Sequence, residues 1–344
     1  MIEARHLRVL RAVSRAGSFS GAARELGCTQ PAVSQQMKAL EQSAGTPLLV
    51  RSGRSMRLTE AGEALTRHAA GILAGLTAAE EEVAAIAGLR SGRVRLVSFP
   101  SGSSTIVPSA VARMRAEYPG TKISLEEAEP PRSVELLRSG DCEIALAFRY
   151  LGHRSDDFAL GGGAGGVDEW DDLVVQPLLT DRLIALVPSG HRLARADPGS
   201  RVEAAVPLPA GASDDPAVGP APSPGGRSVR MTELADEQWI AGCPRCRRHL
   251  VDVCESEGFT PRIDFATDDY PAVAGLVGAG LGVAMLPELA LRSVRPHGVT
   301  LIDVYPAVRR EVVALTLPDL AHVPAVGGML TRLAEAAQDC VRRQ

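Results

Sequence analysis

The 344-residue sequence has no long apolar run and no apolar segment at its start. One long uncharged stretch, residues 271–287, has seventeen residues interrupted by four glycines, whereas a membrane-spanning helix needs about 20 apolar residues. The first fifteen residues contain five charged side chains, a pattern that excludes a secretory signal there. We therefore expect a cytoplasmic protein that does not enter a membrane.

Motifs of the common hydrolases and nucleotide-binding enzymes are also missing. The sequence contains no H-E-x-x-H, G-x-S-x-G or G-x-x-x-x-G-K-[ST], and its seven histidines show no paired metal-ligand spacing. Residues 161–166 formally fit G-x-G-x-x-G, but no strand pattern leads into them and no helix pattern follows, so we interpret them as a flexible loop. An enzyme is therefore not expected, and no cofactor is predicted.

Two short helical patterns lie within residues 18–41, separated by a tight break at residues 27–29. Ser18 suits the N-cap of the first helix and Thr29 that of the second. Pro31 falls in the first turn of the second helix, where a proline costs little. This arrangement predicts a helix-turn-helix, whose second helix enters the major groove of DNA.

The outward side of this second helix carries four polar side chains. Their hydroxyl and amide groups can hydrogen-bond base edges, and a cation can bind a phosphate. For an isolated helix a merely solvated face is the simpler interpretation, but the basic segment that follows favours DNA reading. The predicted DNA contacts in the helix are Gln30, Pro31, Ser34, Gln35 and Lys38.

Residues 48–59 alternate apolar and basic side chains around a Ser-Gly pair, which is typical of a short β-hairpin. Arg51 and Arg54 lie at its tip, so we predict a wing that contacts phosphates or the minor groove. The first 60 residues hold nine Lys and Arg against four Asp and Glu, a balance of +5; the whole chain has a net charge of −4, which leaves −9 for the remainder. Only this first part should attract double-stranded DNA.

Residues 60–89 contain no proline, and their apolar residues recur at spacings of four and three. A helix over this segment would be about 45 Å long. One heptad seam needs a partner seam, so we predict dimerisation here; the alternative is an amphipathic helix lying on its own domain. The seam consists of Leu65, Ala69, Ile72, Leu76, Ala79, Val83 and Ile86.

From residue 91 onward, strand and helix patterns alternate, which predicts a parallel sheet with both faces covered. The expected strands are 93–99, 122–126, 143–148, 182–187, 238–241, 262–266 and 282–286. The expected helices are 103–118, 133–139, 247–257 and 271–280, with a final helix at 323–341.

Several of these segments closely resemble LysR-type transcriptional regulators. The N-terminal signature of that family is matched by Gln30–Glu41, Gly45–Leu49, Arg51–Arg54 and Leu58–Gly62. Two residues depart from it, because Leu49 stands where the family usually has Phe and Val50 where it usually has an acidic residue. Farther along, the resemblance continues in Ser98–Pro108, Tyr118–Pro119, Gly140–Leu146 and Val277–Pro287.

The resemblance implies an α plus α/β fold: a winged helix-turn-helix at residues 1–59, a linker and dimerisation helix at 60–90, and an effector-binding domain at 91–344. The last part would have two α/β lobes of the periplasmic-binding-protein type joined by crossing strands. Lobe I would comprise about 91–178 plus 318–344, and lobe II about 179–317.

The implied function is sequence-specific transcriptional regulation controlled by a small-molecule effector. The implied partners are operator DNA, the transcription machinery and further copies of the chain, in a homodimer or homotetramer. A solute-binding protein would share the two lobes. It would, however, need an export signal and would lack the basic DNA-binding segment at residues 1–59, so this alternative is not favoured.

An effector is expected in the cleft at the C-terminal ends of the strands, where helix N-termini offer unpaired N–H groups. The turn after the first strand is rich in hydroxyls, which suits a small carboxylate or polar metabolite, although a serine such as Ser103 can simply cap the helix. The hydroxyl-bearing candidates are Ser98, Ser101, Ser103, Ser104 and Thr105. The resemblance places further strand-end residues at the cleft: Pro130, Phe148, Arg149, Gly242, Cys243, Thr267 and Asp268. Of these, Arg149 is the expected partner of an anionic effector.

Cysteine is scarce, with six residues, and Cys243 and Cys246 form a single C-x-x-C pair followed by His249 and Cys254. The same scaffold could therefore act as a redox or metal sensor, although one pair without a second is weak evidence. The arginines at 245, 247 and 248 would lower a thiol pKa, but they equally suit an anionic ligand or a solvated helix start.

Two stretches fall outside the resemblance, residues 151–172 and 197–226. Residues 198–226 contain seven Pro, five Gly and six Ala, a composition that buries little surface. A mobile loop without an assigned function is expected there.

Overall fold

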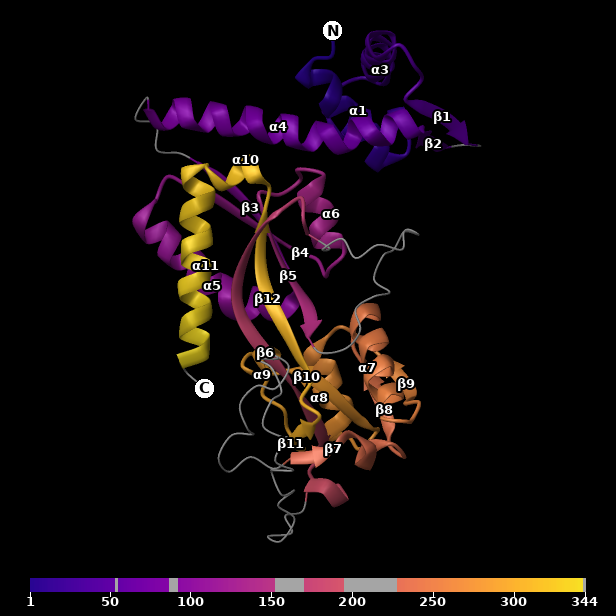
Figure 1. Ribbon diagram of the computed structural model, residues 1–344, viewed down its shortest axis with the longest axis vertical. Helices are drawn as coiled ribbons and strands as arrows, with labels where there is room; N and C mark the ends of the chain where they lie inside the picture. Colours follow the sequence, from indigo (N-terminus) through magenta and orange to yellow (C-terminus); the bar gives the residue numbers. More distant parts are fainter. Residues whose placement is uncertain (53–54, 87–91, 152–169, 195–227, 343–344) are drawn as a thin grey trace, which may run out of the picture.

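The computed structural model describes residues 1–52, 55–86, 92–151, 170–194 and 228–342 (Figure 1). Arg54 and the two expected loops, 161–166 and 197–226, lie outside these ranges. Figure 1 shows an N-terminal head and a long helix at one end of the molecule, with two lobes stacked below them.

The head begins with three helices, α1 (Ala4–Ala16), α2 (Phe19–Glu25) and α3 (Gln30–Ala44). Gly17 ends α1 at φ 62°, and the Ser18 side chain caps α2 by accepting a hydrogen bond from the Gly21 N–H at 3.1 Å. Thr29 occupies the N-cap position of α3, but its side chain accepts no capping hydrogen bond. The helix-turn-helix prediction is confirmed.

The core of the head is formed mainly by the inner sides of its helices, with Leu10, Val13, Ala22, Val33, Met37 and Leu40 all buried. The strands β1 (Leu49–Ser52) and β2 (Ser55–Leu58) pair antiparallel, with Leu49 opposite Leu58, so the predicted hairpin is present. Ala16 and Leu26 fit apolar faces by spacing, yet both are exposed, because each lies at a helix end where the chain turns away from the core.

Helix α4 (Glu60–Ile86) follows the hairpin and is about 40 Å long at 1.5 Å per residue. Its Ala69 and Leu73 pack against Leu7 of α1, and its Ala74 joins the core of the first lobe. The linker helix therefore has one side covered by its own chain.

The lobes share one ten-stranded sheet with the order β4-β3-β5-β12-β6-β10-β8-β9, to which β11 and β7 add off this path. Lobe I contains β3 (Arg93–Ser98), β4 (Lys122–Glu127) and β5 (Ile144–Leu151), in which β3 pairs parallel with both others. Lobe II contains β8 (Gln238–Ala241), β9 (Arg262–Ala266) and β10 (Val283–Pro287), also parallel.

Two antiparallel strands connect the lobes. The first half of β6 (Val174–Pro188) pairs with β12 (Arg309–Thr316), and its second half pairs with β10 and β11 (Val299–Tyr305). The sequence patterns predicted residues 182–187 of β6 but missed its first half and the whole of β7 (Ser228–Arg230), β11 and β12.

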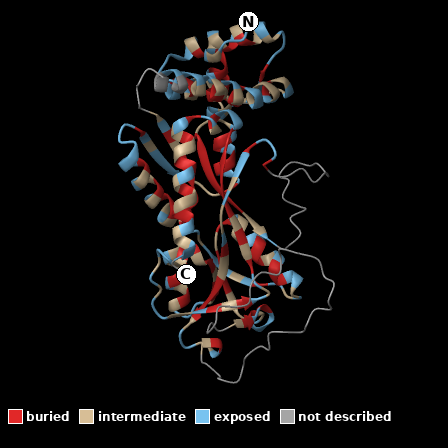
Figure 2. Ribbon diagram, turned by 60° about the vertical axis from the view of Figure 1, so that its left-hand side comes forward, coloured by how far each residue is buried: buried red, intermediate tan, exposed pale blue. Residues whose placement is uncertain are grey.

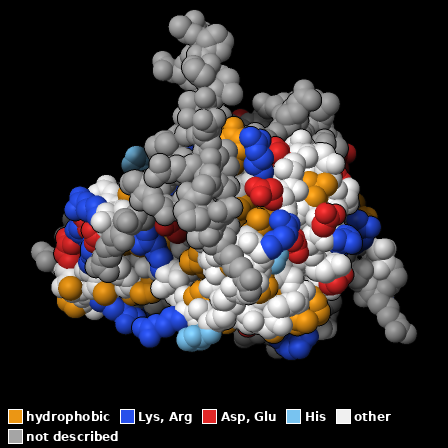
Figure 3. All heavy atoms as spheres, turned by 90° about the horizontal axis from the view of Figure 1, so that it is seen from below, with side chains coloured by type: hydrophobic (Ala, Val, Ile, Leu, Met, Phe, Trp, Pro, Cys, Tyr) orange, Lys and Arg blue, Asp and Glu red, His pale blue; other side chains and the backbone are white. Residues whose placement is uncertain are grey.

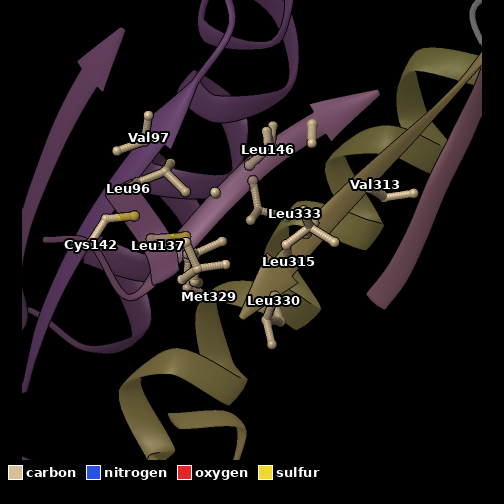
Figure 4. Packing of buried hydrophobic residues seen from close by; sticks show 14 of the residues in the cluster. Leu96, Val97, Leu137, Cys142, Leu146, Val313, Leu315, Met329, Leu330 and Leu333 are labelled. Atoms are coloured by element: carbon tan, nitrogen blue, oxygen red, sulfur yellow. The ribbon is translucent and has the colours of Figure 1, made fainter. Parts of the chain in front are cut away.

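Helices α5 (Pro100–Glu117) and α11 (Pro324–Arg342) pack side by side in lobe I (Figure 1). The core between them and the strands is apolar, and Leu96, Leu146, Val313 and Leu333 are all buried in it (Figure 4). Figure 2 shows buried residues concentrated along the central strands. The remaining helices are α6 (Arg132–Arg138), α7 (Pro244–Ser256), α8 (Tyr270–Gly278), α9 (Glu288–Leu291) and α10 (Pro318–Ala321), with 3-10 turns η1 (Arg192–Ala194) and η2 (Met231–Leu234).

Candidate functional sites

The polar side of α3 lies on the surface of the head. Its apolar stripe is buried, and as a consequence the predicted base-reading side chains project away from the core. Ser34 is half-buried, whereas the other four predicted residues are exposed: Gln30, Pro31, Gln35 and Lys38.

The hairpin beside α3 presents two exposed arginines within its described part, Arg51 on β1 and Arg57 on β2. The sequence reasoning missed Arg57, although strand alternation places it on the solvent side opposite Val50. Val50 is 47 % exposed and stands where the family usually has an acid, so Arg57 has no carboxylate directly across the hairpin. The wing surface therefore carries more basic character than the signature alone indicated.

Charge is distributed differently at the other end of the molecule. Figure 3 views the lobe II end, where basic and acidic side chains are intermingled with apolar ones on the part not covered by grey atoms. The surplus of basic residues belongs to the head, as the sequence count indicated.

An apolar stripe on α4 faces solvent. Ile72, Leu76 and Val83 are 53 %, 37 % and 67 % exposed, and they share one helix face because they are spaced by four and seven residues. Leu65 and Ala69 of the predicted seam instead contact the head's own core, and the side chain of Ile86 lies outside the described part. Part of the seam thus lies on its own domain, and pairing with a second copy through the exposed part remains a prediction.

A pocket that is partly open to solvent is lined by residues of both lobes. Lobe I contributes Glu129 and Tyr150, and lobe II contributes Cys243, Cys246 and Tyr270. Of the predicted effector residues, Gly242, Cys243 and Asp268 line this pocket.

The hydroxyl groups expected to receive an effector bond to the chain itself. Thr105 Oγ1 donates to the Ser101 carbonyl at 2.5 Å, and Ser104 Oγ lies 3.1 Å from Ser293 Oγ. Ser98 is fully buried. Helix α5 begins at Pro100 with Phe99 as its N-cap, so Ser103 lies inside the helix and does not cap it. None of these hydroxyl-bearing residues is among those that line the pocket.

Arg149 does not line the pocket either. Its Nε donates to Glu311 Oε2 at 2.7 Å, and its guanidinium lies 5.4 Å from the ring centre of Trp170. The expectation of an anionic effector therefore loses the support of Arg149, its favoured partner. Pro130 and Phe148 are buried, and Thr267 Oγ1 accepts a hydrogen bond from the Asp269 N–H; none of these three lines the pocket.

A buried ion pair lies where the crossing strands meet. Arg310 of β12 and Asp181 of β6 are 1 % and 2 % exposed, and Arg310 Nε and Nη2 lie 3.0 and 2.8 Å from Asp181 Oδ2. Arg310 Nη2 also donates to Ser101 Oγ at 2.8 Å, and Asp181 Oδ1 accepts from the Leu289 N–H at 3.0 Å. The sequence reasoning missed this pair because β12 was not predicted.

The two pocket cysteines lie at the start of α7. Cys243 is the N-cap, its Sγ is 2.8 Å from Cys246 Sγ, and the Cys246 N–H points at it over 3.4 Å. The hydrogen bond from Cys243 lowers the pKa of Cys246 to about 6, with further help from a hydrogen bond with Tyr150 and the charge of Arg310, against the effect of burial. The same shared proton raises the pKa of Cys243.

Two neighbouring residues of lobe I complete this wall of the pocket. Burial raises the pKa of Glu129 to about 8, and the nearby Cys246 thiolate adds to the effect. Its Oε2 atom is buried with no hydrogen-bond partner in the described part of the chain. Tyr150 stacks on His249 of α7 with ring centres 3.5 Å apart and planes 10° apart, which links β5 to lobe II.

Within the described ranges, no group of three or more His, Cys, Asp or Glu side chains is arranged to hold a metal ion. Among the helices in those ranges, none combines the length and the apolar character needed to cross a bilayer.

Comparison with known proteins identifies relatives along nearly the whole chain. Transcriptional dual regulator GltC of Bacillus subtilis is 26 % identical over 316 residues, covering 90 % of this chain and 89 % of the relative. HTH-type transcriptional regulator AlsR of the same organism is 27 % identical, covering 84 % and 82 %.

Solved structures share the fold. A full-length OxyR variant from Pseudomonas aeruginosa is 17 % identical, with a TM-score of 0.64, covering 97 % of this chain and 95 % of that one. Full-length CbnR complexed with its target DNA is 18 % identical, with a TM-score of 0.53, covering 97 % and 100 %.

Family models agree with both comparisons. Residues 4–63 match the bacterial regulatory helix-turn-helix protein of the lysR family, and residues 87–205 and 216–338 match the LysR substrate-binding domain. The winged head, the two lobes and these matches lead to one assignment: the chain belongs to the LysR family of transcriptional regulators.

Proposed function

We propose that this regulator reads operator bases with α3 and holds the DNA backbone with its wing. The observation that carries this proposal is that the polar side of α3 is exposed beside exposed arginines of the hairpin. The opposite, apolar side of α3 is buried in the core of the head. The residues assigned to DNA contact are Gln30, Pro31, Ser34, Gln35, Lys38, Arg51, Arg54 and, added here, Arg57. A protein that binds operator DNA would act in the cytoplasm. No catalytic role is assigned to this regulator.

We further propose that two copies pair through the exposed stripe of α4. Exposed apolar side chains in a single stripe are costly unless a partner covers them. The stripe would bring two heads together, which suits operators with two half-sites spaced by about one helical turn or a multiple of it. The proposed units remain 1–59, 60–90 and 91–344.

The proposed effector site is the pocket between the lobes. Gly242, Cys243 and Asp268 keep their predicted role, joined by Glu129 and Tyr150 from the opposite lobe. A ligand that contacts both lobes can favour one relative arrangement of them, because it shifts the equilibrium by its difference in affinity for the two arrangements.

The test is a binding titration on specific and random duplexes at several salt concentrations. Gln30→Ala or Ser34→Ala should reduce discrimination by about 1–3 kcal/mol per lost base contact. Arg51→Ala should weaken binding to both duplexes and lower the salt slope by about one counterion, because it removes a phosphate contact.

Arg132→Ala serves as the control for charge loss, since Arg132 is an exposed arginine on α6, outside the head. Equal affinity of the Gln30→Ala protein and the unaltered protein for both duplexes, at every salt concentration, would contradict the assignment of α3.

A further inference from the structure

Two thiols of the effector pocket are placed for bond formation with each other. Cys243 Sγ and Cys246 Sγ are 2.8 Å apart, and a disulfide is about 2.05 Å long. A movement of less than about 1 Å would therefore close the bond. Cys243 is the N-cap of α7 and Cys246 lies in its first turn, and both are on the wall of a pocket that is partly open to solvent.

The two thiols are chemically unequal. Cys246 is partly exposed, accepts the hydrogen bond of Cys243 and faces the charges of Arg310 and Arg245. Cys243 is 6 % exposed and keeps its proton. Because a thiolate is the reactive form of cysteine, Cys246 is the nucleophile at neutral pH and Cys243 is the second thiol.

We propose that Cys243 and Cys246 form a redox switch in the effector pocket, oxidised by a small hydroperoxide. In the first step the Cys246 thiolate attacks the terminal peroxide oxygen and the O–O bond breaks. The leaving alkoxide or hydroxide takes a proton, so that Cys246 becomes a sulfenic acid and the peroxide an alcohol or water. Cys243 Sγ then attacks Cys246 Sγ; the S–S bond forms, the S–O bond breaks, and the thiol proton leaves with the hydroxide as water.

This switch would act on the contact between the lobes. Tyr150 comes from β5 of lobe I, and its hydroxyl hydrogen-bonds Cys246 of lobe II. Oxidation removes the thiolate charge and weakens the acceptor that Tyr150 uses. Glu129, also of lobe I, loses a neighbouring negative charge in the same step. The effector for this pocket would therefore be an oxidant that changes its wall, and the consequence for transcription rests on the proposed function above.

A metal site is the less favoured role of the same pair. Two thiolates supply only two ligands, whereas structural zinc sites use four, and the described residues offer no group of three candidate ligands. The redox role needs no third ligand.

The first experiment follows the chemistry in the full-length protein. Trypsin cleaves after Arg245, so a disulfide between Cys243 and Cys246 joins two peptides that otherwise separate. Mass spectrometry measures the amount of this linked peptide pair. We expect the linked peptides after treatment with hydrogen peroxide and their loss after dithiothreitol. Cys340, a partly exposed cysteine on α11, serves as the internal reference and should remain reduced.

The second experiment measures the pH dependence of alkylation at each cysteine. Cys246 should be half-reactive near pH 6, and Tyr150→Phe should move that midpoint upward, because the thiolate loses a hydrogen-bond donor. A one-unit rise would lower the thiolate fraction at pH 6 roughly fivefold. The Cys340 profile should not change, which separates a positioning role of Tyr150 from a general loss of structure.

Operator binding separates the two levels of the proposal. The redox switch would be overturned if peroxide produced no linked peptides, or if the alkylation midpoint of Cys246 lay at or above about pH 8.5. If the protein still selected its operator in that case, the proposed regulatory function would stand. Protection of both thiols from alkylation by Zn²⁺, without disulfide formation in peroxide, would also overturn it in favour of a metal site. No operator selectivity in the reduced protein would instead contradict the proposed function.

Discussion

At the scale of single residues, the buried pair between Arg310 and Asp181 stands at the crossing of the two strands that connect the lobes. Each charge is almost fully removed from water, and the Arg310 guanidinium centre lies 4.6 Å from the ring centre of Phe148 and 5.1 Å from that of Phe99. A pair of this kind adds little net stability when complete but is costly to break. It therefore fixes geometry at the strand crossing.

Replacing Asp181 by Asn should lower the free energy of unfolding by about 3–5 kcal/mol, because the Arg310 charge stays buried without its counter-ion. Urea denaturation measures this change. The control is Asp172→Asn, which breaks the exposed pair with Arg138 and should cost less than about 1 kcal/mol. A similar small loss in both variants would show that the buried pair does not constrain the fold.

Glu129 should make stability depend on pH. Its pKa rises to about 8 in the folded protein, so the native state holds a proton that the unfolded chain releases near its ordinary value of about 4.5. Stability should therefore fall as pH rises from about 5 through 8. Glu129→Gln keeps the neutral shape and should lessen this decline, which urea midpoints at pH 5, 6.5 and 8 would reveal. Parallel pH curves for the two proteins would refute it.

At the scale of elements, α4 serves two purposes on two sides. One side packs on α1 and on lobe I, and the other presents Ile72, Leu76 and Val83 to solvent. A helix in an isolated globular protein would have one apolar side, so the second apolar side indicates a partner.

Ile72→Asp should shift the protein toward the monomer, because it places a charge in the centre of the proposed helix pair. Sedimentation velocity measures the change, and an increase of the dissociation constant by at least about tenfold, or about 1.4 kcal/mol, is expected. The control is Arg67→Asp, an exposed position outside the stripe. Unchanged association of the Ile72→Asp protein would place the dimer contact elsewhere.

The elements that sequence reasoning recovered are those with local signals. Regular apolar periods and turn residues predicted the head and the parallel strands of both lobes. Strand β12 was missed because its first residues, Arg309 and Arg310, are charged, and only distant partners make them a strand. The same cause misplaced the expectation for Arg149, whose directly opposite neighbour on β12 is Glu311. The sequence did predict that Gly242, Cys243 and Asp268 lie at the cleft, and they line the pocket. This prediction succeeded because the ends of parallel strands converge at one edge of a sheet.

At the scale of the whole molecule, the head is tied to lobe I by an ionic contact. Asp141, just after α6, pairs with Arg11 at 3.3 Å and with Arg15, both on α1. Burial lowers the pKa of Arg11 to about 10, and the like charge of Arg15 adds to the effect. Asp141 thus compensates two neighbouring cations at the boundary between head and lobe.

Asp141→Asn should loosen this boundary without unfolding either part. Asparagine keeps an oxygen acceptor but loses the negative charge, and weakening these charge-assisted hydrogen bonds by about 1 kcal/mol should accelerate hydrogen exchange in α1 roughly fivefold. Asp172→Asn, in an ion pair that does not involve the head, is the matched control. If exchange in α1 were the same in both variants, the contact would have no role in holding the head.

The crossing strands have a mechanical consequence. Strand β6 runs without a break from one lobe into the other, and the chain entering β12 passes from Val308 in the lobe II core to Val312 in the lobe I core. Rotation of one lobe against the other must therefore bend a hydrogen-bonded ribbon and cannot swivel on a slack peptide. Such a connection should resist rotation of the lobes elastically. A ligand that rotates them must supply the bending energy, and the lobes should return to their resting arrangement when the ligand leaves.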